Sequence, residues 1–232
     1  MSDCSNIYED FINQISLQGI NTNSVISALT HTSYSKDNNL PYAECYERLE
    51  FLGDAVLKLV VSDILYKKFP DYKEGEMTKI RASLVSDEFI LNFANDIEIG
   101  KYIRISSSLE KDGGRNTPSI LSCAFEALLG AMFESGMEYS KIYNFINKFF
   151  EKYFPELEHQ LPKFNSKGIL QEYTQSVNQT LPIYFTKTVP EGFYTQIVFE
   201  SVTIGEGTAK SKRESEREAA YSACQKLKLI GD

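Results

Sequence analysis

The sequence has few residues of the kinds that cross-link a protein chain. Its 232 residues include two histidines and four cysteines, which lie far apart and never at CxxC or HxxxH spacing. Zinc sites need closely spaced ligands of this kind, and disulfide frameworks need regularly spaced cysteines. We therefore expect neither a zinc site nor disulfide bonds, and we place the protein in a reducing compartment, the cytoplasm.

Long apolar runs are also lacking. No stretch approaches the ~18 consecutive apolar residues that a membrane span requires. The N-terminal segment MSDCSNIYED is acidic and lacks the apolar core of a signal peptide. The sequence therefore predicts a soluble protein without a membrane partner.

An excess of positive charge is the third absence. Lys and Arg number 24 against 32 Asp and Glu, which gives a net charge of -8. This balance excludes a protein that coats nucleic acid or anionic membranes by bulk charge, but it leaves room for a local basic patch. Residues 166–232 hold eight basic and eight acidic side chains, so the negative excess lies in residues 1–165. We expect the two parts to have different roles.

Apolar periodicity divides the chain at the same place. From residue 7 to about 154, apolar residues recur at intervals of three and four, which is typical of helices. The predicted helical segments are 10–15, 22–34, 47–69, 77–93, 119–133 and 139–154, with a polar loop at 106–116. We therefore predict an all-α domain at residues 1–155.

A different pattern follows residues 156–165, which we interpret as a linker because prolines lie in and beside this segment. The later segments are helical at 169–177, strand-like at 183–188 and 194–202, and helical again at 211–229. The order helix, strands, helix predicts a small α+β domain at residues 166–232.

Two carboxylates in apolar helices are the most informative feature of the first part. Asp54 lies within FLGDAVL, and Glu126 is the only charged residue in SILSCAFEALLGAMF. Burying an ionised carboxylate without a partner costs several kcal/mol. Each acid must therefore be neutral, paired with a basic side chain or bound to a metal ion.

The spacing of the neighbouring acids favours a metal ion. Glu47, Glu50 and Asp54 share one helical face, where like charges repel each other unless a cation holds them together. Glu126 would add a further oxygen ligand of the type that Mg²⁺ prefers, and Glu74 would complete the site. Carboxylate-held Mg²⁺ suits the hydrolysis of phosphodiesters, because it activates water and stabilises charge on the phosphate.

Ion pairing is the alternative explanation for these acids. The basic side chains that would neutralise them are Arg48, Lys58, Arg81 and Arg115. In that case the protein would be a helical dimer without a metal ion and without a nucleic-acid substrate.

Basic residues gather at the start of the last predicted helix. Ser211 and Glu214 have the spacing of a capping box, which places the helix start near Lys212. Cations in a first turn oppose the helix dipole, but a bound phosphate would reverse that cost. The predicted phosphate-binding residues are Lys210, Lys212, Arg213 and Arg217. The alternative is a solvated basic turn.

The predicted order helix, strands, helix favours a bound phosphate over a solvated basic turn. Modules that bind double-stranded RNA read backbone shape and 2′-hydroxyl groups rather than sequence. Polar side chains on the first helix of the second part suit such contacts; they are Gln171, Glu172 and Gln175.

Both parts resemble one family. The segment ERLEFLGDAVL at 47–57 is similar to the signature of ribonuclease III, the Mg²⁺-dependent endonuclease of double-stranded RNA. ALTHTSY at 28–34, EGEMTKIRASLV at 74–85 and FEALLGA at 125–131 resemble other segments of its catalytic domain. LQEY at 170–173 and SKRESE at 211–216 resemble a double-stranded RNA-binding domain.

The resemblance implies an all-α endonuclease domain followed by a small α+β domain of order α-β-β-β-α. It implies that Glu50 and Glu126 are metal ligands, that Asp54 and Glu126 are catalytic, and that Glu47 and Glu74 support the cleft. It also implies Mg²⁺, which Mn²⁺ could replace, no small-molecule cofactor, and a homodimer in which each cleft cuts one strand. Expected substrates are ribosomal and other structured RNA precursors, cut to 5′-phosphate and 3′-hydroxyl ends.

Cys123 departs from the family pattern. The family has a metal-binding Asp three residues before the second catalytic Glu, and this chain has Cys123 there. Cysteine prefers softer ions than Mg²⁺, so Cys123 is a doubtful ligand. Because the other acids are in place, we expect an active enzyme. The alternative is a catalytically impaired protein that binds double-stranded RNA on the same dimeric scaffold.

Overall fold

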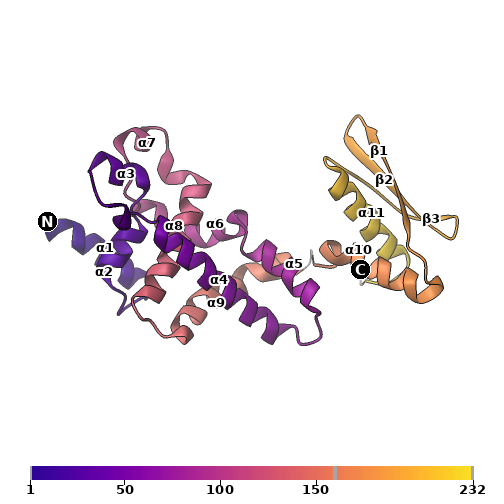
Figure 1. Cartoon of the computed structure of the whole chain (residues 1–232), viewed down its shortest axis with the longest axis horizontal. Coiled ribbons are helices and arrows are strands. Elements are labelled where there is room, and N and C mark those ends of the chain that lie inside the picture. The colour runs from indigo at the N-terminus through magenta and orange to yellow at the C-terminus, as the bar shows by residue number, and fades with distance from the viewer. Residues whose placement is uncertain (1, 159–160, 231–232) are drawn as a thin grey trace. The chain divides into compact units, whose positions relative to one another are not determined.

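We analysed a computed structural model of the chain, which describes residues 2–158 and 161–230. The chain forms two compact units, one up to Lys152 and one from Tyr153 onward. The first unit is helical, and the second combines helices with a three-stranded sheet (Figure 1). This arrangement confirms the predicted fold class. None of the helices described is both long and apolar enough to cross a membrane.

The first unit is built almost entirely from α-helices and short 3₁₀ turns. Its elements are α1 (Ser2–Gln14), α2 (Thr22–Ala28), α3 (Thr32–Asp37), η1 (Tyr42–Glu44), α4 (Glu47–Lys68), α5 (Glu74–Leu84), α6 (Asp87–Asp96), η2 (Ile99–Lys101), α7 (Ser107–Lys111), η3 (Gly114–Asn116), α8 (Pro118–Glu134) and the part of α9 (Tyr139–Glu158) up to Lys152. Helix α8 is the most buried of them, and it packs against α2, α4 and α6. Its Phe125 ring lies 5.7 Å from the ring of Phe93 on α6, within a cluster of aromatic rings.

Three segments differ from their sequence predictions because polar side chains cap new helices. Residues 22–34 form two helices, since His31 caps α3 by accepting a hydrogen bond from the Ser33 N–H at 3.0 Å. Residues 77–93 are likewise divided, since Ser86 caps α6. The predicted loop at 106–116 contains α7, which Ser106 caps. Apolar periodicity is insensitive to such caps, because it continues across them.

The predicted linker is helical where the structure describes it. Helix α9 continues to Glu158, and α10 begins at Leu161, with Pro162 as its second residue. Proline is tolerated in the first turn of a helix, because its missing N–H would have no partner there. Pro162 therefore does not mark an extended segment, and Pro155 lies inside α9. The domain boundaries at 155 and 166 stay predictions.

The second unit packs two helices on one antiparallel sheet. Its elements are α10 (Leu161–Asn178), β1 (Ile183–Val189), β2 (Gly192–Phe199), β3 (Val202–Ala209) and α11 (Lys212–Lys226), with the strands in the order β1-β2-β3. Thr195, Ile197 and Phe199 of β2 are buried, as the predicted alternation requires. The second strand ends earlier than predicted, because Glu200 and Ser201 adopt positive φ and start the turn into β3.

Candidate functional site

The centre of the first unit is a very close crossing of α4 and α8. A Cβ atom added to Gly53 of α4 would lie 1.7 Å from the carbonyl oxygen of Glu126. One added to Gly130 of α8 would lie 2.1 Å from the carbonyl oxygen of Leu49. Because only glycine lacks this atom, the two residues allow backbone contact between the helices. The crossing brings the acidic face of α4 to Glu126.

The predicted acids Glu47, Glu50 and Asp54 lie close enough to one another or to Glu126 for their charges to raise the pKa of Glu50 or of Glu126. Burial is the main cause that raises the pKa of Glu126, which reaches about 8. The negative charges of Asp54 and Glu50 add to that rise. Burial also raises the pKa of Glu50, with Glu47 and Asp54 among the acids that contribute. The group therefore holds more negative charge than its surroundings compensate.

Basic side chains do not neutralise this group. Lys58 contacts the Asp54 carboxylate at 2.7 Å, but both side chains are partly exposed, and exposed pairs of this kind contribute little. Within the described ranges, neither Glu50 nor Glu126 has a basic side chain at ion-pair distance. Arg115 instead pairs with Glu110. The ion-pairing alternative therefore does not account for these acids.

The donor chemistry of the group fits a hard divalent cation. Carboxylate oxygens are the ligands that Mg²⁺ and Mn²⁺ take, and the mutual repulsion of the acids is what a cation would relieve. In the parts of the chain that the structure covers, no three His, Cys, Asp or Glu side chains are placed to hold a metal ion. The support for a metal ion thus comes from the negative charge of these acids and from their oxygen donors, and not from ligands already arranged around a metal position.

Cys123 lies one helical turn before Glu126 on α8. Burial, followed by its hydrogen bond with Glu50 and the charge of Glu50, raises the pKa of the Cys123 thiol to about 12. The thiol is therefore protonated at neutral pH. Cysteine prefers softer ions than Mg²⁺, so Cys123 is a poor ligand for a hard cation.

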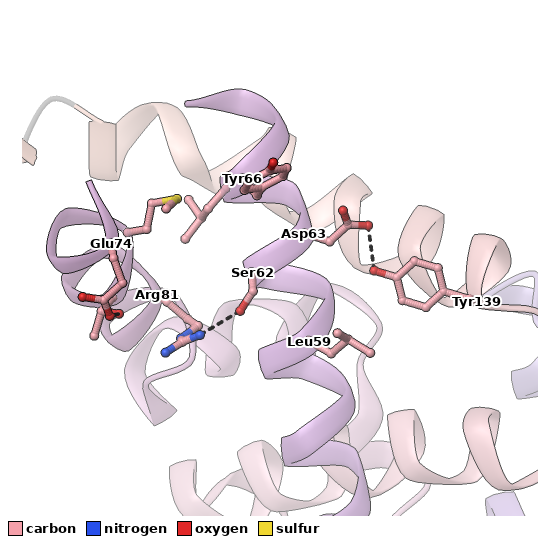
Figure 2. A pocket seen from close by; sticks show the side chains of 10 residues that line it. Leu59, Ser62, Asp63, Tyr66, Glu74, Arg81 and Tyr139 are labelled. Carbon is pink, nitrogen blue, oxygen red and sulfur yellow. Dashed lines mark hydrogen bonds between the residues drawn. The ribbon is translucent and has the colours of Figure 1, made fainter. Parts of the chain in front are cut away.

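The two predicted supporting acids lie in different surroundings. Glu47 begins α4 and accepts a hydrogen bond from the Tyr42 hydroxyl. Glu74 begins α5, accepts a hydrogen bond from Thr78 at 2.8 Å, and lines a cavity of about 450 Å³ between α4 and α5. Figure 2 shows Glu74 in this cavity near Arg81. Glu74 is not among the acids whose charges act on Glu126.

Asp87 is an acid of this site that sequence reasoning missed. It is the first residue of α6, and its charge raises the pKa of Glu50, Cys123 and Glu126. In the sequence, an acid after a capping serine looks like a group that complements a helix dipole. The N-cap pattern Ser86–Asp87 was the available signal, but it says nothing about which helix Asp87 approaches.

The predicted phosphate-binding residues lie at the start of α11. Ser211 caps this helix by accepting a hydrogen bond from the Glu214 N–H at 3.3 Å, so the helix starts at Lys212 as predicted. Lys210, Lys212 and Arg213 are exposed. Arg217 lies one turn later, and its guanidinium contacts Glu214 at 3.1 Å. The structure thus presents cations beside the first turn of the helix, where backbone N–H groups lack partners within the helix.

The predicted contact residues of α10 share its exposed face. Gln171, Glu172 and Gln175 are all exposed, whereas the neighbouring Leu170 and Thr174 are buried. This alternation leaves a polar helical face available to a ligand.

Comparisons with known proteins agree with both units. The family described as Ribonuclease-III-like matches residues 21–153, and the family described as Double-stranded RNA binding motif matches residues 166–227. "Ribonuclease 3" of Aliarcobacter butzleri is 40% identical over 214 residues, which cover 90% of this chain and 92% of that protein. "Ribonuclease 3" of Listeria monocytogenes is 34% identical over 230 residues, which cover 96% of this chain and 98% of that protein.

Solved structures give the same result for the first unit. The crystal structure of the nuclease domain of ribonuclease III from Campylobacter jejuni is 37% identical, with a TM-score of 0.56. The match covers 63% of this chain and 95% of that one. A second structure of that domain, described as flexible in a region involved in dimer formation, has a TM-score of 0.55 at 36% identity and covers 62% of this chain and 99% of that one.

A helical nuclease domain together with a double-stranded RNA-binding domain defines an endoribonuclease, a hydrolase of RNA phosphodiester bonds. Relatives of this class match nearly the whole chain. The chain belongs to the ribonuclease III family.

Proposed function

We propose that the protein cleaves double-stranded RNA by hydrolysis that depends on Mg²⁺, with Mn²⁺ as a substitute, and leaves 5′-phosphate and 3′-hydroxyl ends. The observation that carries this proposal is the group of uncompensated carboxylates at the crossing of α4 and α8. When bound there, the ion would activate water and offset the charge of the phosphate. A polyanionic substrate would otherwise be repelled by the same carboxylates.

The roles of the acids follow from their positions. Glu50 and Glu126 would hold the ion, because the charge of Glu50 acts on Glu126 and, among the described residues, neither has a basic side chain at ion-pair distance. Asp54 would orient the attacking water, while its contact with Lys58 holds the carboxylate in place. Glu47 and Glu74 would support the cleft and the scissile strand.

A single assay separates the enzyme from the binding protein. Labelled duplex RNA is incubated with the protein in Mg²⁺, in Mn²⁺ and in EDTA, and the products are sized. We expect shortening with either ion and none in EDTA. Binding without shortening in both ions would establish the alternative, a double-stranded RNA-binding protein that lacks activity.

We also propose that the protein works as a homodimer through α4. Phe51, Leu59 and Tyr66 lie on one face of α4 at helical spacing and are 82%, 56% and 72% exposed. Leu59 and Tyr66 also line the cavity of about 450 Å³, as Figure 2 shows. A self-complementary interface of two-fold symmetry would bury this apolar stripe of Phe51, Leu59 and Tyr66. Glu74, at the same cavity, would then lie at the interface.

Replacing Phe51 by arginine tests this interface. An arginine in place of Phe51 in this apolar stripe would leave a charge without a partner on each side of a two-fold contact. We expect Phe51→Arg to be monomeric at micromolar concentration in sedimentation velocity, whereas the wild type is dimeric. The matched control is Ile7→Arg on α1, which changes an exposed apolar residue away from α4 and should leave the dimer intact. A dimeric Phe51→Arg would place the interface elsewhere.

The RNA-binding surface of the second unit predicts a salt effect. Lys212→Ala combined with Arg213→Ala should weaken duplex binding about tenfold for every sequence and reduce the slope of log Kd against log salt by about two. The reason is that two phosphate contacts are lost. Lys226→Ala with Lys228→Ala removes the same charge from the other end of α11 and should change the slope less. Equal slopes for the two double variants would contradict the assignment.

The proposal also covers the natural RNA substrates, the domain boundaries and the cellular compartment of the protein. Modules of this kind read duplex shape, so the substrates would be RNA stems. The resemblance to the family implies that these stems belong to ribosomal and other structured RNA precursors. The nuclease domain would span residues 1–155 and the RNA-binding domain 166–232, joined by 156–165. Cys45, Cys123 and Cys224 are free, which supports a reducing compartment, the cytoplasm.

A further inference from the structure

The second unit holds a cavity of about 350 Å³ that is lined by residues of β1, β2 and α11. Its volume is within the range of about 300–1,000 Å³ that is usual for sites of small ligands. The side chains that give the cavity its chemistry are Phe185 and Lys187 of β1, Tyr194 of β2 and Lys212 of α11. Residues that lie far apart in the chain therefore surround one space.

The strand register gathers two aromatic rings on one face of the sheet. Lys187 of β1 pairs directly with Tyr194 of β2, and Phe185 lies two positions before Lys187 on the same face. Ile197, on the opposite face of β2, is buried in the core with residues of α10 and α11. Phe185 and Tyr194 are thus diagonal neighbours on the outer face, where aromatic side chains are within reach of each other. Phe185 is 57% exposed and Tyr194 is partly exposed, so both rings are accessible to a ligand.

The described residues that line the cavity bring positive charge and no carboxylate. Lys187 and Lys212 are both exposed, and neither forms an ion pair within the described part of the chain. The Lys187 ammonium lies 5.1 Å from the centre of the Tyr194 ring, so the cation and the ring form one surface. Glu206 of β3 accepts hydrogen bonds from Gln196 at 3.0 Å and from the Tyr194 hydroxyl, and it is not among the lining residues.

Aromatic rings beside cations have the chemistry that binds nucleotides. A base of any sequence can stack on an aromatic ring, and lysine side chains contact phosphates. In a duplex each base is stacked between its neighbours, so its faces cannot reach a protein ring unless the base leaves the stack. The cavity therefore fits a nucleotide whose base is unpaired.

Lys212 joins the cavity to the predicted RNA-binding surface. It is the first residue of α11, after the Ser211 cap, and it is one of the residues predicted to contact duplex phosphates. A strand whose phosphate contacts Lys212 is therefore adjacent to the cavity. A free nucleotide would offer the same base and phosphate, but it would lack the additional contacts of a duplex with α10 and α11.

We propose that this cavity binds an unpaired nucleotide that extends from a duplex held by the second unit. The base would stack on Phe185 and Tyr194, and its phosphate would lie at Lys187 or Lys212. The inference rests on the proposed binding of duplex RNA and adds a preference for duplexes with an unpaired end. It gives the outer face of the sheet a role in RNA recognition.

The test compares duplex RNAs of equal length, with blunt ends or with a short unpaired adenosine tail at the 3′ or the 5′ end. Binding to the full-length protein is measured in EDTA, so that the RNA stays intact, and 2-aminopurine in the tail reports stacking by a loss of fluorescence. We expect one of the tailed duplexes to bind about tenfold more tightly than the blunt one, because a stacked base adds affinity. The fluorescence of its tail should fall on binding.

Substitutions on β1 and β2 locate the binding site of the tail. Phe185→Ala removes one ring and should lower the ratio of tailed to blunt affinity below about threefold, with less quenching of the tail. Tyr194→Leu removes the other ring and should have the same effect. The matched control is Ile183→Ala, because Ile183 lies on the same face of β1, is also 57% exposed and does not line the cavity. This control should keep the wild-type ratio, and melting temperatures show that each variant is folded.

The possible failures are distinguishable. Equal ratios in Phe185→Ala and Ile183→Ala would overturn the inference, as would equal binding of tailed and blunt duplexes by the wild type, and both results leave duplex binding in place. Adenosine monophosphate serves as a competitor, and its displacement of the tail at micromolar concentration would assign the cavity to a free nucleotide and overturn the assignment to RNA. A wild type that binds neither RNA would refute the proposed binding of duplex RNA and the inference with it.

Discussion

Replacing Glu126 by glutamine should lower the rate of duplex RNA cleavage by about a thousandfold, which corresponds to about 4 kcal/mol of transition-state stabilisation. The side chain keeps its size and polarity but loses the charge that would bind the ion. Burial and neighbouring acids already disfavour the ionised form of Glu126, as its raised pKa of about 8 shows. The neutral glutamine should therefore fold at least as well as the wild type in the absence of metal.

The control for this variant lies on the same helix. Glu134 ends α8 and accepts a hydrogen bond from the Ser24 hydroxyl at 2.6 Å, away from the acid group. Glu134→Gln removes the same charge and should retain cleavage within a factor of about two. Single-turnover rates at saturating RNA, measured over a range of Mg²⁺, provide the comparison. A Glu126→Gln protein that cleaves at the wild-type rate would show that this carboxylate is not at the reacting centre.

Gly53→Ala should destabilise the first unit by about 3 kcal/mol or more, because overpacking of a tight contact forces the backbone to move. The added Cβ would lie 1.7 Å from the Glu126 carbonyl oxygen and 2.9 Å from the Gly130 nitrogen, which are backbone atoms and cannot rotate away. The melting temperature should fall by roughly 10 °C. Cleavage should fall as well, because the two helices would separate at the point that aligns Glu50 with Glu126.

Gly75 provides the contrast. It lies in α5, and nothing lies within 4 Å of a Cβ added to it. Gly75→Ala should leave the melting temperature unchanged or raise stability by up to ~1 kcal/mol, since alanine favours helices over glycine. Thermal unfolding followed by circular dichroism measures both variants. A Gly53→Ala protein as stable as Gly75→Ala would mean that the helices do not cross in backbone contact.

Periodicity and capping predicted much of the fold, and their failures have clear physical causes. The helical first part, the exposed and buried faces of β2, and the Ser211 cap of α11 depend on local interactions, which sequence spacing reports directly. The division of residues 22–34 depends on the imidazole of His31 acting as a cap, which is an unusual capping group. Apolar spacing cannot detect such an interruption.

The candidate site was predictable to the extent that it lies on single helices. The face shared by Glu50 and Asp54 follows from helical spacing, and Glu126 was identified because it is the only charge in an apolar helix. The approach of Asp87 depends on tertiary packing of α6 against α8 through Ser122, which no local pattern encodes. Glu74 lies on α5 and lines the cavity between α4 and α5, and its supporting role stays a prediction.

The most direct test of this account is to locate the ion itself. Crystals of the full-length protein grown with Mn²⁺ would be measured at the manganese absorption edge, and an anomalous difference map would show where the ion binds. We predict a peak between Glu50 and Glu126 at the crossing of α4 and α8, with carboxylate oxygens as its protein ligands. A peak elsewhere, or full Mn²⁺-dependent cleavage with no ion bound at this crossing, would contradict the account.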